Sequence, residues 1–315
     1  MYGQYGKEIE QISINFFTII ILYFMSDVVQ SEFGKIKTLF IERASASFIN
    51  DVHIEKHWAA LNYLGKPNIE KALHEYETFE NILKEHGAAL LYFSQDDSVN
   101  MDSIYCRDAS IATSHGMIIC NMGKAGRANE PAAQARAFKE QGVKVVGTIV
   151  APGTVEGGDV AWLDANTIAV GHTYRTNEEG IRQLKAILNP IGVEVIVAEM
   201  PHYKGPSDVF HLMSVLSPVD KNLAVVYSPL MPIAFRNLLM ARGYELVEVP
   251  EEEFDSMGCN VLAIAPRVCL MVKGNPKTKK ALEQAGCKVI EYEGTEISVK
   301  GGGGPTCLTR PITRS

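Results

Sequence analysis

The stretch "GGDVAWLDANTIAVGHTYRTNEEGIRQLKAILNPIGVEVIVAEM", residues 157–200, holds one complete structural unit. Two apolar runs stand on either side of the turn residues Asp-Ala-Asn, which is typical of two antiparallel strands. An amphipathic segment follows and ends before Gly192, and a glycine just past a helical pattern is the usual left-handed cap. A Val- and Ile-rich run comes next. The stretch therefore predicts the order strand, strand, helix, strand.

The same order recurs along the chain, so one unit predicts the architecture of the whole. Glycines that end an expected helix follow one another at intervals of 43 to 55 residues, and each precedes a strand-like run. These glycines are Gly87, Gly142, Gly192, Gly243 and Gly286. Pairs of apolar runs precede the last four helices, at residues 103–120, 157–171, 210–227 and 259–272.

The first expected helix, residues 67–87, is preceded by a single strand at 33–42. The missing partner of this strand is the last apolar run of the chain, residues 306–312. Pairing the two would close the five units into a ring. We therefore expect an α/β fold, a five-bladed ββαβ propeller with pseudo-fivefold symmetry. Residues 31–315 form one catalytic domain in this interpretation, with a central cavity where the first strands of the units end.

Four consecutive glycines, residues 301–304, stand directly before this closing run. Glycine loses the most backbone freedom on folding, so an ordered glycine run needs a structural reason. We expect residues 296–299 and 307–312 to be strands on either side of it. The glycines would then let the backbone approach the centre closely, where side chains would collide.

The composition limits the partners of the protein. With 315 residues and 46% hydrophobic content the chain can bury a large core. A net charge of −7 without a Lys/Arg cluster disfavours nucleic acid and anionic membranes and favours a small cation. None of the six cysteines forms a CxxC pair, which excludes a zinc ribbon and fits a reducing cytoplasm.

The N-terminus has an apolar stretch at residues 12–25, shorter than the ~20 residues that span a bilayer. It lacks the basic flank of a signal peptide, since Lys7, Glu8 and Glu10 precede it. We interpret residues 1–30 as an extension outside the domain, either an upstream mis-start before Met25 or a disordered segment. A membrane anchor is the less favoured alternative.

Chemically reactive residues occur where the repeat predicts a shared centre. They are Asp102 and Asp108 in the second unit, Glu156 and Asp159 in the third, His211 in the fourth, and Cys307 in the closing segment. A cysteine and a histidine in one pocket suggest a nucleophile with a general acid/base. Several carboxylates suggest a cationic substrate, and a planar guanidinium matches carboxylates in bidentate fashion.

Five ordered motifs, "DSIYCRD", "EGGDV", "GHTYRTNEEG", "FHLMS" and "GGGGPTC", together resemble the guanidino-group-modifying enzymes of the pentein fold. These are the dimethylarginine dimethylaminohydrolases, the arginine deiminases and the amidinotransferases. The resemblance covers roughly residues 31–312, and the family's five-bladed propeller agrees with the repeat.

The resemblance implies a role for each matched residue. Cys307 would be the nucleophile and His211 the general acid/base, while Asp102 and Asp108 would bind the substrate. Glu156 and Asp159 would hold the guanidinium and orient the histidine. Arg127 and Arg175 match arginines that bind the α-carboxylate of the substrate. Neither a metal nor another cofactor is implied, because the substrate carries its own positive charge.

The implied reaction is hydrolysis of a guanidinium through a cysteine-linked amidino intermediate, giving citrulline and an amine. Met213 and Thr306 replace an aspartate and an arginine of the deiminases, which favours a methylated arginine as substrate. Arg107 replaces a glutamate common in dimethylargininases, and the glycine run looks deiminase-like. Arginine deiminase, amidinotransferase and a non-catalytic binding protein of this fold stay open as alternatives, as does a homo-oligomer.

Overall fold

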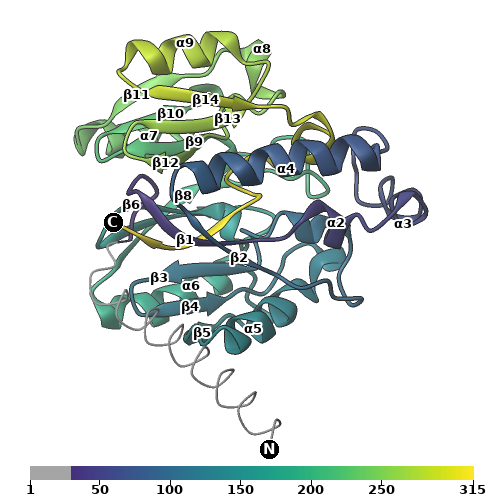
Figure 1. The fold of residues 1–315 in the computed structure, drawn as a ribbon. Helices are drawn as coiled ribbons and strands as arrows, with labels where there is room; N and C mark the ends of the chain where they lie inside the picture. Colours follow the sequence, from purple (N-terminus) through teal and green to yellow (C-terminus); the bar gives the residue numbers. More distant parts are fainter. Residues whose placement is uncertain (1–29) are drawn as a thin grey trace, which may run out of the picture.

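The computed structural model describes residues 30–315, which form five three-stranded sheets (Figure 1). In each sheet the middle strand runs antiparallel to one neighbour and parallel to the other. The sheets are β15 (Arg310–Arg314), β1 (Ile36–Ile41), β2 (Ala89–Tyr92); β3 (Ser110–Thr113), β4 (Gly116–Ile119), β5 (Val145–Thr148); β6 (Val160–Asp164), β7 (Thr167–His172), β8 (Glu194–Glu199); β9 (Leu216–Asp220), β10 (Leu223–Val226), β11 (Glu245–Glu248); and β12 (Leu262–Ala265), β13 (Val268–Val272), β14 (Lys288–Tyr292). The predicted mixed α/β unit is therefore confirmed. The extension expected at residues 1–30 lies outside the described residues except for Gln30.

Each sheet has one helix that connects its middle strand to its parallel outer strand. These helices are α4 (Ile69–Glu85), α5 (Glu130–Glu140), α6 (Glu178–Leu188), α7 (Ile233–Ala241) and α9 (Pro276–Gln284). The five predicted capping glycines all have positive φ angles, between 69° and 83°. That conformation is strained for residues with a Cβ, so these glycines end the helices as predicted.

Three short helices lie outside this repeat: α2 (Ala44–Ser47), α3 (Asp51–His57) and α8 (Glu251–Phe254). Figure 1 shows α9 and α5 at opposite edges of the molecule, with the strands between them. Among the described residues, no helix combines the length and apolarity that crossing a bilayer requires.

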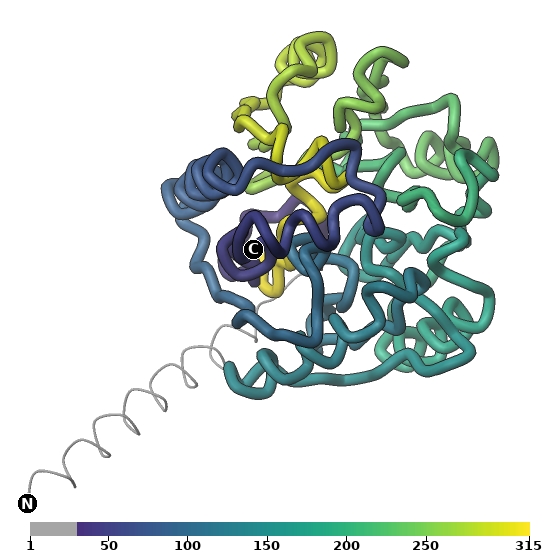
Figure 2. The backbone as a smooth tube through the Cα atoms, turned by 90° about the vertical axis from the view of Figure 1, so that its right-hand side faces the viewer, coloured from purple at the N-terminus to yellow at the C-terminus, as the bar shows by residue number. Residues whose placement is uncertain are grey.

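The last strand pairs with the first, as the sequence predicted. Arg310 lies opposite Phe40 and Arg314 opposite Ile36 in the antiparallel register of β15 and β1. The C-terminal segment accordingly lies beside the first described strand in the tube view (Figure 2).

Two parts of the predicted closing segment differ from expectation. Residues Thr295–Val299 form a π-helical turn and not a strand, because the Glu75 carboxylate accepts the N–H groups of Glu296 and Ile297 and holds the turn. The closing strand begins at Arg310, since Cys307 lies in a turn in which its N–H donates to Gly304 O at 3.0 Å.

The strands β15, β3, β6, β9 and β12 contact one another across the sheets. β15 lies against β3, β6 against β9, and β9 against β12. Trp162 of β6 donates its Nε1 proton to Ala112 O of β3 at 3.1 Å, and Arg314 of β15 donates to Ala263 O of β12 at 2.8 Å. The ends of these strands surround the cavity described next.

Candidate active site

A cavity of about 280 Å³ brings most of the predicted site residues together. It is lined by Asp102, Asp108, Arg127, Arg175, His211 and Cys307, among others. Glu156 and Asp159 are completely buried behind this lining. Residues from separate units, far apart in the sequence, therefore share one pocket.

His211 and Glu156 form a buried pair beside the cavity. His211 precedes the short turn Leu212–Ser214, and its Nε2 lies 2.8 Å from Glu156 Oε2. Burial alone would lower the pKa of His211, but the carboxylates of Asp159, Glu156 and Asp108 outweigh it and raise the pKa to about 9. Burial opposes ionisation of Glu156, yet the hydrogen bond from His211 lowers its pKa below the usual value. The imidazole is therefore a cation at neutral pH and can act as an acid.

Asp159 forms hydrogen bonds next to the histidine. Its Oδ2 accepts hydrogen bonds from Thr173 Oγ1 and Thr176 Oγ1 at 2.7 and 2.6 Å, and its Oδ1 accepts the Leu212 N–H at 2.9 Å. Both carboxylate oxygens thus bond to the protein, and the side chain is fully buried. The Leu212 bond links Asp159 to the residue after His211, so an orienting role stays a prediction that this geometry fits, whereas both oxygens already have partners within the protein.

Asp108 offers one unsatisfied oxygen. It lies in the turn at residues 106–109, is 2% exposed, and accepts Arg127 Nη1 on Oδ2 at 2.5 Å. Its Oδ1 is buried without a hydrogen-bond partner in the described part of the chain. A buried orphan acceptor on a cavity wall is suited to an N–H donor of a ligand.

Arg127, expected to bind a carboxylate of the substrate, is instead held almost entirely by the protein. Its Nε and Nη2 donate to the two Glu130 oxygens at 2.8 and 2.7 Å, and Nη2 also donates to Tyr105 O at 2.9 Å. Since Nη1 binds Asp108, one N–H of Nη1 is left outside these bonds. The contacts make Arg127 a positioning residue for Asp108.

Arg175 keeps more of its donors available. Nη2 donates to Asp208 O at 3.1 Å, Nη1 is 3.5 Å from Glu156 Oε1, and Nε has no partner among the described residues. The side chain of Arg175 lines the cavity, and the residue is 3% exposed. Its free Nε fits the expected contact with an anionic group of a ligand.

Asp102 is paired with a lysine that the sequence reasoning missed. Lys124 Nζ lies 2.6 Å from Asp102 Oδ2 and also donates to Leu61 O at 3.2 Å. The backbone N–H of Lys124 donates to Glu156 Oε1 at 2.9 Å. Lys124 lies three residues before Arg127, and only this nearness in sequence could have indicated it.

Cys307 is partly exposed on the cavity wall and is contacted by a second overlooked residue. Asn260 Nδ2 lies 3.4 Å from the sulfur, and Asn260 Oδ1 accepts both the N–H and the hydroxyl of Thr306, at 3.0 and 2.8 Å. Burial raises the pKa of the Cys307 thiol and Asp108 adds to the rise, while the Thr306 and Asn260 contacts oppose it. Asn260 stands in no motif, so nothing in the sequence singled it out.

The glycine run passes close to two side chains, as predicted. A Cβ on Gly301 or Gly303 would overlap the ring or hydroxyl of Tyr105, and one on Gly304 would meet Asn260. Gly302 has a φ of +76°. Tyr105 itself donates to Ile297 O at 3.1 Å, which ties the run to the π-helical turn. The glycines therefore allow the backbone to carry Cys307 to the cavity.

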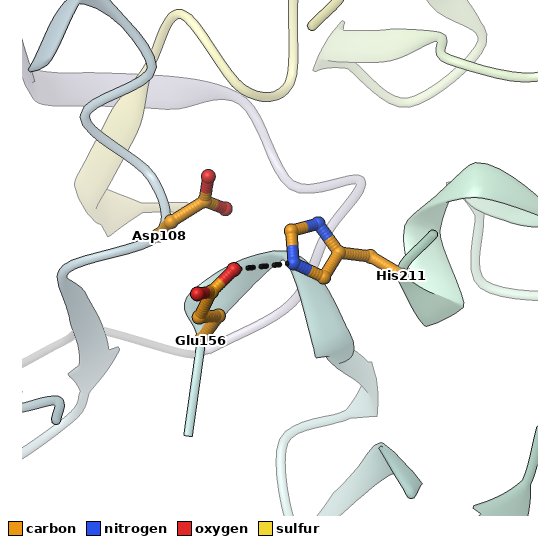
Figure 3. A group of neighbouring side chains, drawn as sticks. All are labelled: Asp108, Glu156 and His211. Atoms are coloured by element: carbon orange, nitrogen blue, oxygen red, sulfur yellow. Dashed lines mark hydrogen bonds and ion pairs between the residues drawn. The ribbon is translucent and has the colours of Figure 1, made fainter. Parts of the chain in front are cut away.

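Asp108, Glu156 and His211 converge from three separate segments (Figure 3). One ligand-type atom of each lies within 4.8 Å of the others, the spacing that a bound cation requires. The His211–Glu156 hydrogen bond needs a proton between its two atoms, which a metal ion would displace. The geometry therefore suits an organic cation with N–H donors better than a metal.

Arg107, the residue that departs from the expected motif, lies away from this cavity. Its side chain is 1% exposed and donates to Glu32 Oε1 at 2.7 Å. Arg107 therefore does not line the cavity, and its positive charge acts on the site only by helping to lower the pKa of Cys307.

The chain is similar to known proteins over most of its length. A family model described as "N,N dimethylarginine dimethylhydrolase, eukaryotic" matches residues 40–314. The chain belongs to this family. The N(G),N(G)-dimethylarginine dimethylaminohydrolase of Pseudomonas aeruginosa is 29% identical over 248 residues, covering 79% of this chain and 91% of that protein.

Solved structures share the fold of this chain. The dimethylarginine dimethylaminohydrolase of Pseudomonas aeruginosa, a mutant complexed with citrulline, has a TM-score of 0.71 at 24% identity and covers 88% of this chain and 100% of its own. The N-terminal domain of ArgZ, a cyanobacterial arginine dihydrolase bound to substrate, has a TM-score of 0.75 at 18% identity and covers 88% and 98%. At these identities the two structures bear on the fold alone.

Proposed function

We propose that this dimethylarginine dimethylhydrolase family member hydrolyses the guanidinium group of an Nω-methylated arginine, giving citrulline and methylamine or dimethylamine. One observation carries the proposal: Cys307, Asp108 with its orphan Oδ1, and His211, which is paired with the buried Glu156, border one cavity. Family membership makes the chain a guanidino hydrolase of the dimethylarginine dimethylaminohydrolase type. The individual roles given below are inferred from geometry and motif position.

The reaction follows from the charges of these groups. The substrate guanidinium donates to Asp108 Oδ1, and its positive charge next to Cys307 favours the thiolate. The sulfur then forms a bond to the guanidinium carbon, and the bond to the methylated nitrogen breaks as His211 gives that nitrogen a proton.

The second half-reaction reverses these roles. Neutral His211 takes a proton from water, the resulting hydroxide oxygen bonds to the amidino carbon, and the carbon–sulfur bond breaks. Citrulline leaves and the thiol is regenerated. Glu156 stabilises the histidine cation at the start of each cycle through the 2.8 Å hydrogen bond.

Met213 supports the choice of a methylated substrate. It lines the cavity and is 3% exposed, at the position where the arginine deiminases carry an aspartate. A thioether packs against N-methyl groups without the desolvation penalty that a carboxylate would suffer beside them. Arginine is therefore the second candidate substrate.

We also propose that the five sheets are the blades of a closed propeller formed by residues 31–315. Support comes from the inner strands, because each consecutive pair of sheets is joined by a strand contact or by the Trp162 and Arg314 hydrogen bonds. All six cysteines are unpaired, which supports a reducing cytoplasm as the compartment.

The function is tested by incubating the purified full chain with asymmetric dimethylarginine, monomethylarginine and arginine, and measuring citrulline. We expect kcat/KM to be highest for a methylated substrate. Faster turnover of arginine would identify a deiminase, and product formed only with an added amine acceptor would identify an amidinotransferase. Ligand binding without any product would support a non-catalytic binding protein and contradict the proposal.

A further inference from the structure

Three arginines and one glutamate are buried outside the lining of the cavity. This arginine cluster consists of Arg107, Arg310, Arg314 and Glu32, with exposed fractions of 1%, 4%, 3% and 7%. Two of its arginines come from β15 and one from the turn before β3. None of the four lines the cavity described above.

The cluster holds more positive than negative charge. Arg107 Nη2 pairs with Glu32 Oε1 at 2.7 Å, whereas Arg310 and Arg314 take part in no ion pair within residues 30–315. Glu32 also accepts the Trp162 N–H on Oε1 at 3.3 Å. Burying unpaired charge in a protein interior is strongly unfavourable, so the surplus calls for a counter-ion.

Each arginine also has a nitrogen without a hydrogen-bond partner. These buried nitrogens are Arg107 Nε, Arg310 Nε and Arg314 Nη2. Arg314 uses Nη1 for Gly34 O and Ala263 O, at 2.6 and 2.8 Å, and leaves Nη2 unused. Buried donors are nearly always satisfied in folded proteins, and three orphan donors among neighbouring guanidinium groups indicate a shared acceptor.

Contacts along the chain link the four residues: Arg107 pairs with Glu32, Arg314 donates to Gly34 O two residues after Glu32, and the backbone N–H of Arg107 donates to Cys307 O three residues before Arg310. Burial, and next the nearby positive charge of Arg107, lower the pKa of Arg310 to about 9. Burial also lowers the pKa of Arg314 to about 10, with Glu32 opposing the change. Burial raises the pKa of Glu32, but the three arginines lower it by more, so the pKa of Glu32 lies below its usual value.

We propose that the arginine cluster binds a small inorganic anion that accepts hydrogen bonds from Arg107, Arg310 and Arg314. Guanidinium groups suit this role because they are weakly hydrated and keep their N–H donors in a fixed plane. The anion stabilises the fold next to the active site, since Arg107 precedes Asp108 and Arg310 follows Cys307 by three residues. The backbone N–H of Arg107 also donates to Cys307 O at 3.1 Å, which joins the turn that contains Asp108 to the turn that contains Cys307.

The test measures the thermal stability of the full chain at constant ionic strength, so that general screening does not change. Potassium gluconate is replaced stepwise by potassium chloride, and in separate series by potassium bromide and potassium sulfate. Tm should rise by a few degrees and saturate in at least one series, because an anion that binds only the folded state stabilises it by mass action. A Tm that is independent of the anion, or that changes without saturation, overturns the proposal.

Two variants give the control. Arg310→Met should lose the saturable rise and should be at least as stable as the wild type in gluconate, because it removes an unpaired buried charge. Arg236→Met, at a surface arginine that pairs with Glu248, should keep the full rise. An Arg310→Met protein that keeps the wild-type response contradicts the proposal.

Wild-type crystals soaked in bromide provide a second measurement that needs no variant. An anomalous peak within hydrogen-bond distance of Arg310 Nε supports a halide. A sulfate-shaped peak in a sulfate soak supports a small oxyanion. Peaks confined to the surface in both soaks contradict the site.

Discussion

His211 and Glu156, fifty-five positions apart in the sequence, form a buried ion pair with Nε2 2.8 Å from Oε2. The glycine pair after Glu156 makes the arrangement possible. A Cβ on Gly158 would overlap His211 Nδ1 and lie 2.8 Å from Asp108 Oδ1, so only glycine lets the imidazole and the two carboxylates meet. The pair fixes both the orientation and the charge of the histidine.

The raised pKa of His211 predicts how stability depends on pH. Because its pKa rises from 6.5 to about 9 on folding, the stabilisation is complete below pH 6.5 and is lost as the pH rises through 9. The loss for a buried group with this shift is on the order of 2–3 kcal/mol. Urea unfolding of the wild type and of His211→Gln at pH 6, 7.5 and 9.5 measures it, and the difference between the two proteins should shrink with pH. The control variant His74→Gln, at an exposed position of α4, should follow the wild type at every pH.

Replacing the nucleophile should separate binding from chemistry. Cys307→Ser should lower kcat by at least about 10³-fold, since a hydroxyl is a far weaker nucleophile, while the Kd for substrate measured by calorimetry changes little. Cys106→Ser is the matched control, because this thiol is fully buried and lies near the Phe40 and Leu308 carbonyl oxygens, outside the cavity lining. Full activity of Cys307→Ser would reassign the nucleophile.

The two arginines of the cavity should respond differently to substitution. Arg175→Ala should raise KM for a methylated arginine by about 10-fold or more and leave KM unchanged for the decarboxylated analogue, because Arg175 lines the cavity and keeps a free Nε donor that we expect to bind the α-carboxylate. Arg127→Ala leaves Asp108 and Glu130 buried without their cation, so it should lower the free energy of unfolding by roughly 3–5 kcal/mol. Denaturant titrations and steady-state kinetics on both variants distinguish the two roles. Equal effects on KM and on stability would contradict the distinction.

The sequence predicted the repeating unit well because each unit carries its own local signals. A capping glycine and two apolar runs around a turn depend on neighbouring residues, and all five glycines and the strand pairing of β1 with β15 are confirmed. The turn at residues 295–299 was predicted wrongly, because its π-helical form depends on Glu75, more than two hundred residues away.

The site could be predicted only in part for the same reason. Motifs identified Cys307, His211 and the carboxylates, but not which donors and acceptors the folded chain satisfies internally. Arg127 matched a ligand-binding position, and only the three-dimensional structure shows its bonds to Glu130 and Asp108. Asn260 carried no signal, since its contact with Cys307 joins two segments 47 residues apart.

The glycine run offers a test of close packing. Gly301→Ala and Gly303→Ala should each lower the free energy of unfolding by about 1–3 kcal/mol, because the new methyl group overlaps Tyr105 and the well-packed core cannot move aside freely. Displacement of the Cys307 turn should lower kcat as well. Gly126→Ala is the control, since its nearest neighbour would be 3.8 Å away, and it should stay within about 0.5 kcal/mol of the wild type.

Asn260 should tune the reactivity of the nucleophile. Its Nδ2 donor faces the sulfur at 3.4 Å and opposes the rise in the pKa of Cys307 that burial causes. Asn260→Leu removes this donor, so the thiol pKa should rise further, and alkylation by iodoacetamide should require a higher pH than in the wild type. The pH at half-maximal alkylation rate, followed by mass spectrometry of the Cys307 peptide, measures the shift. Thr306→Val removes the other contact that opposes the rise and should also move the profile to higher pH. An Asn260→Leu profile identical to the wild type, in a protein with unchanged Tm, would show that the amide has no influence on the thiol.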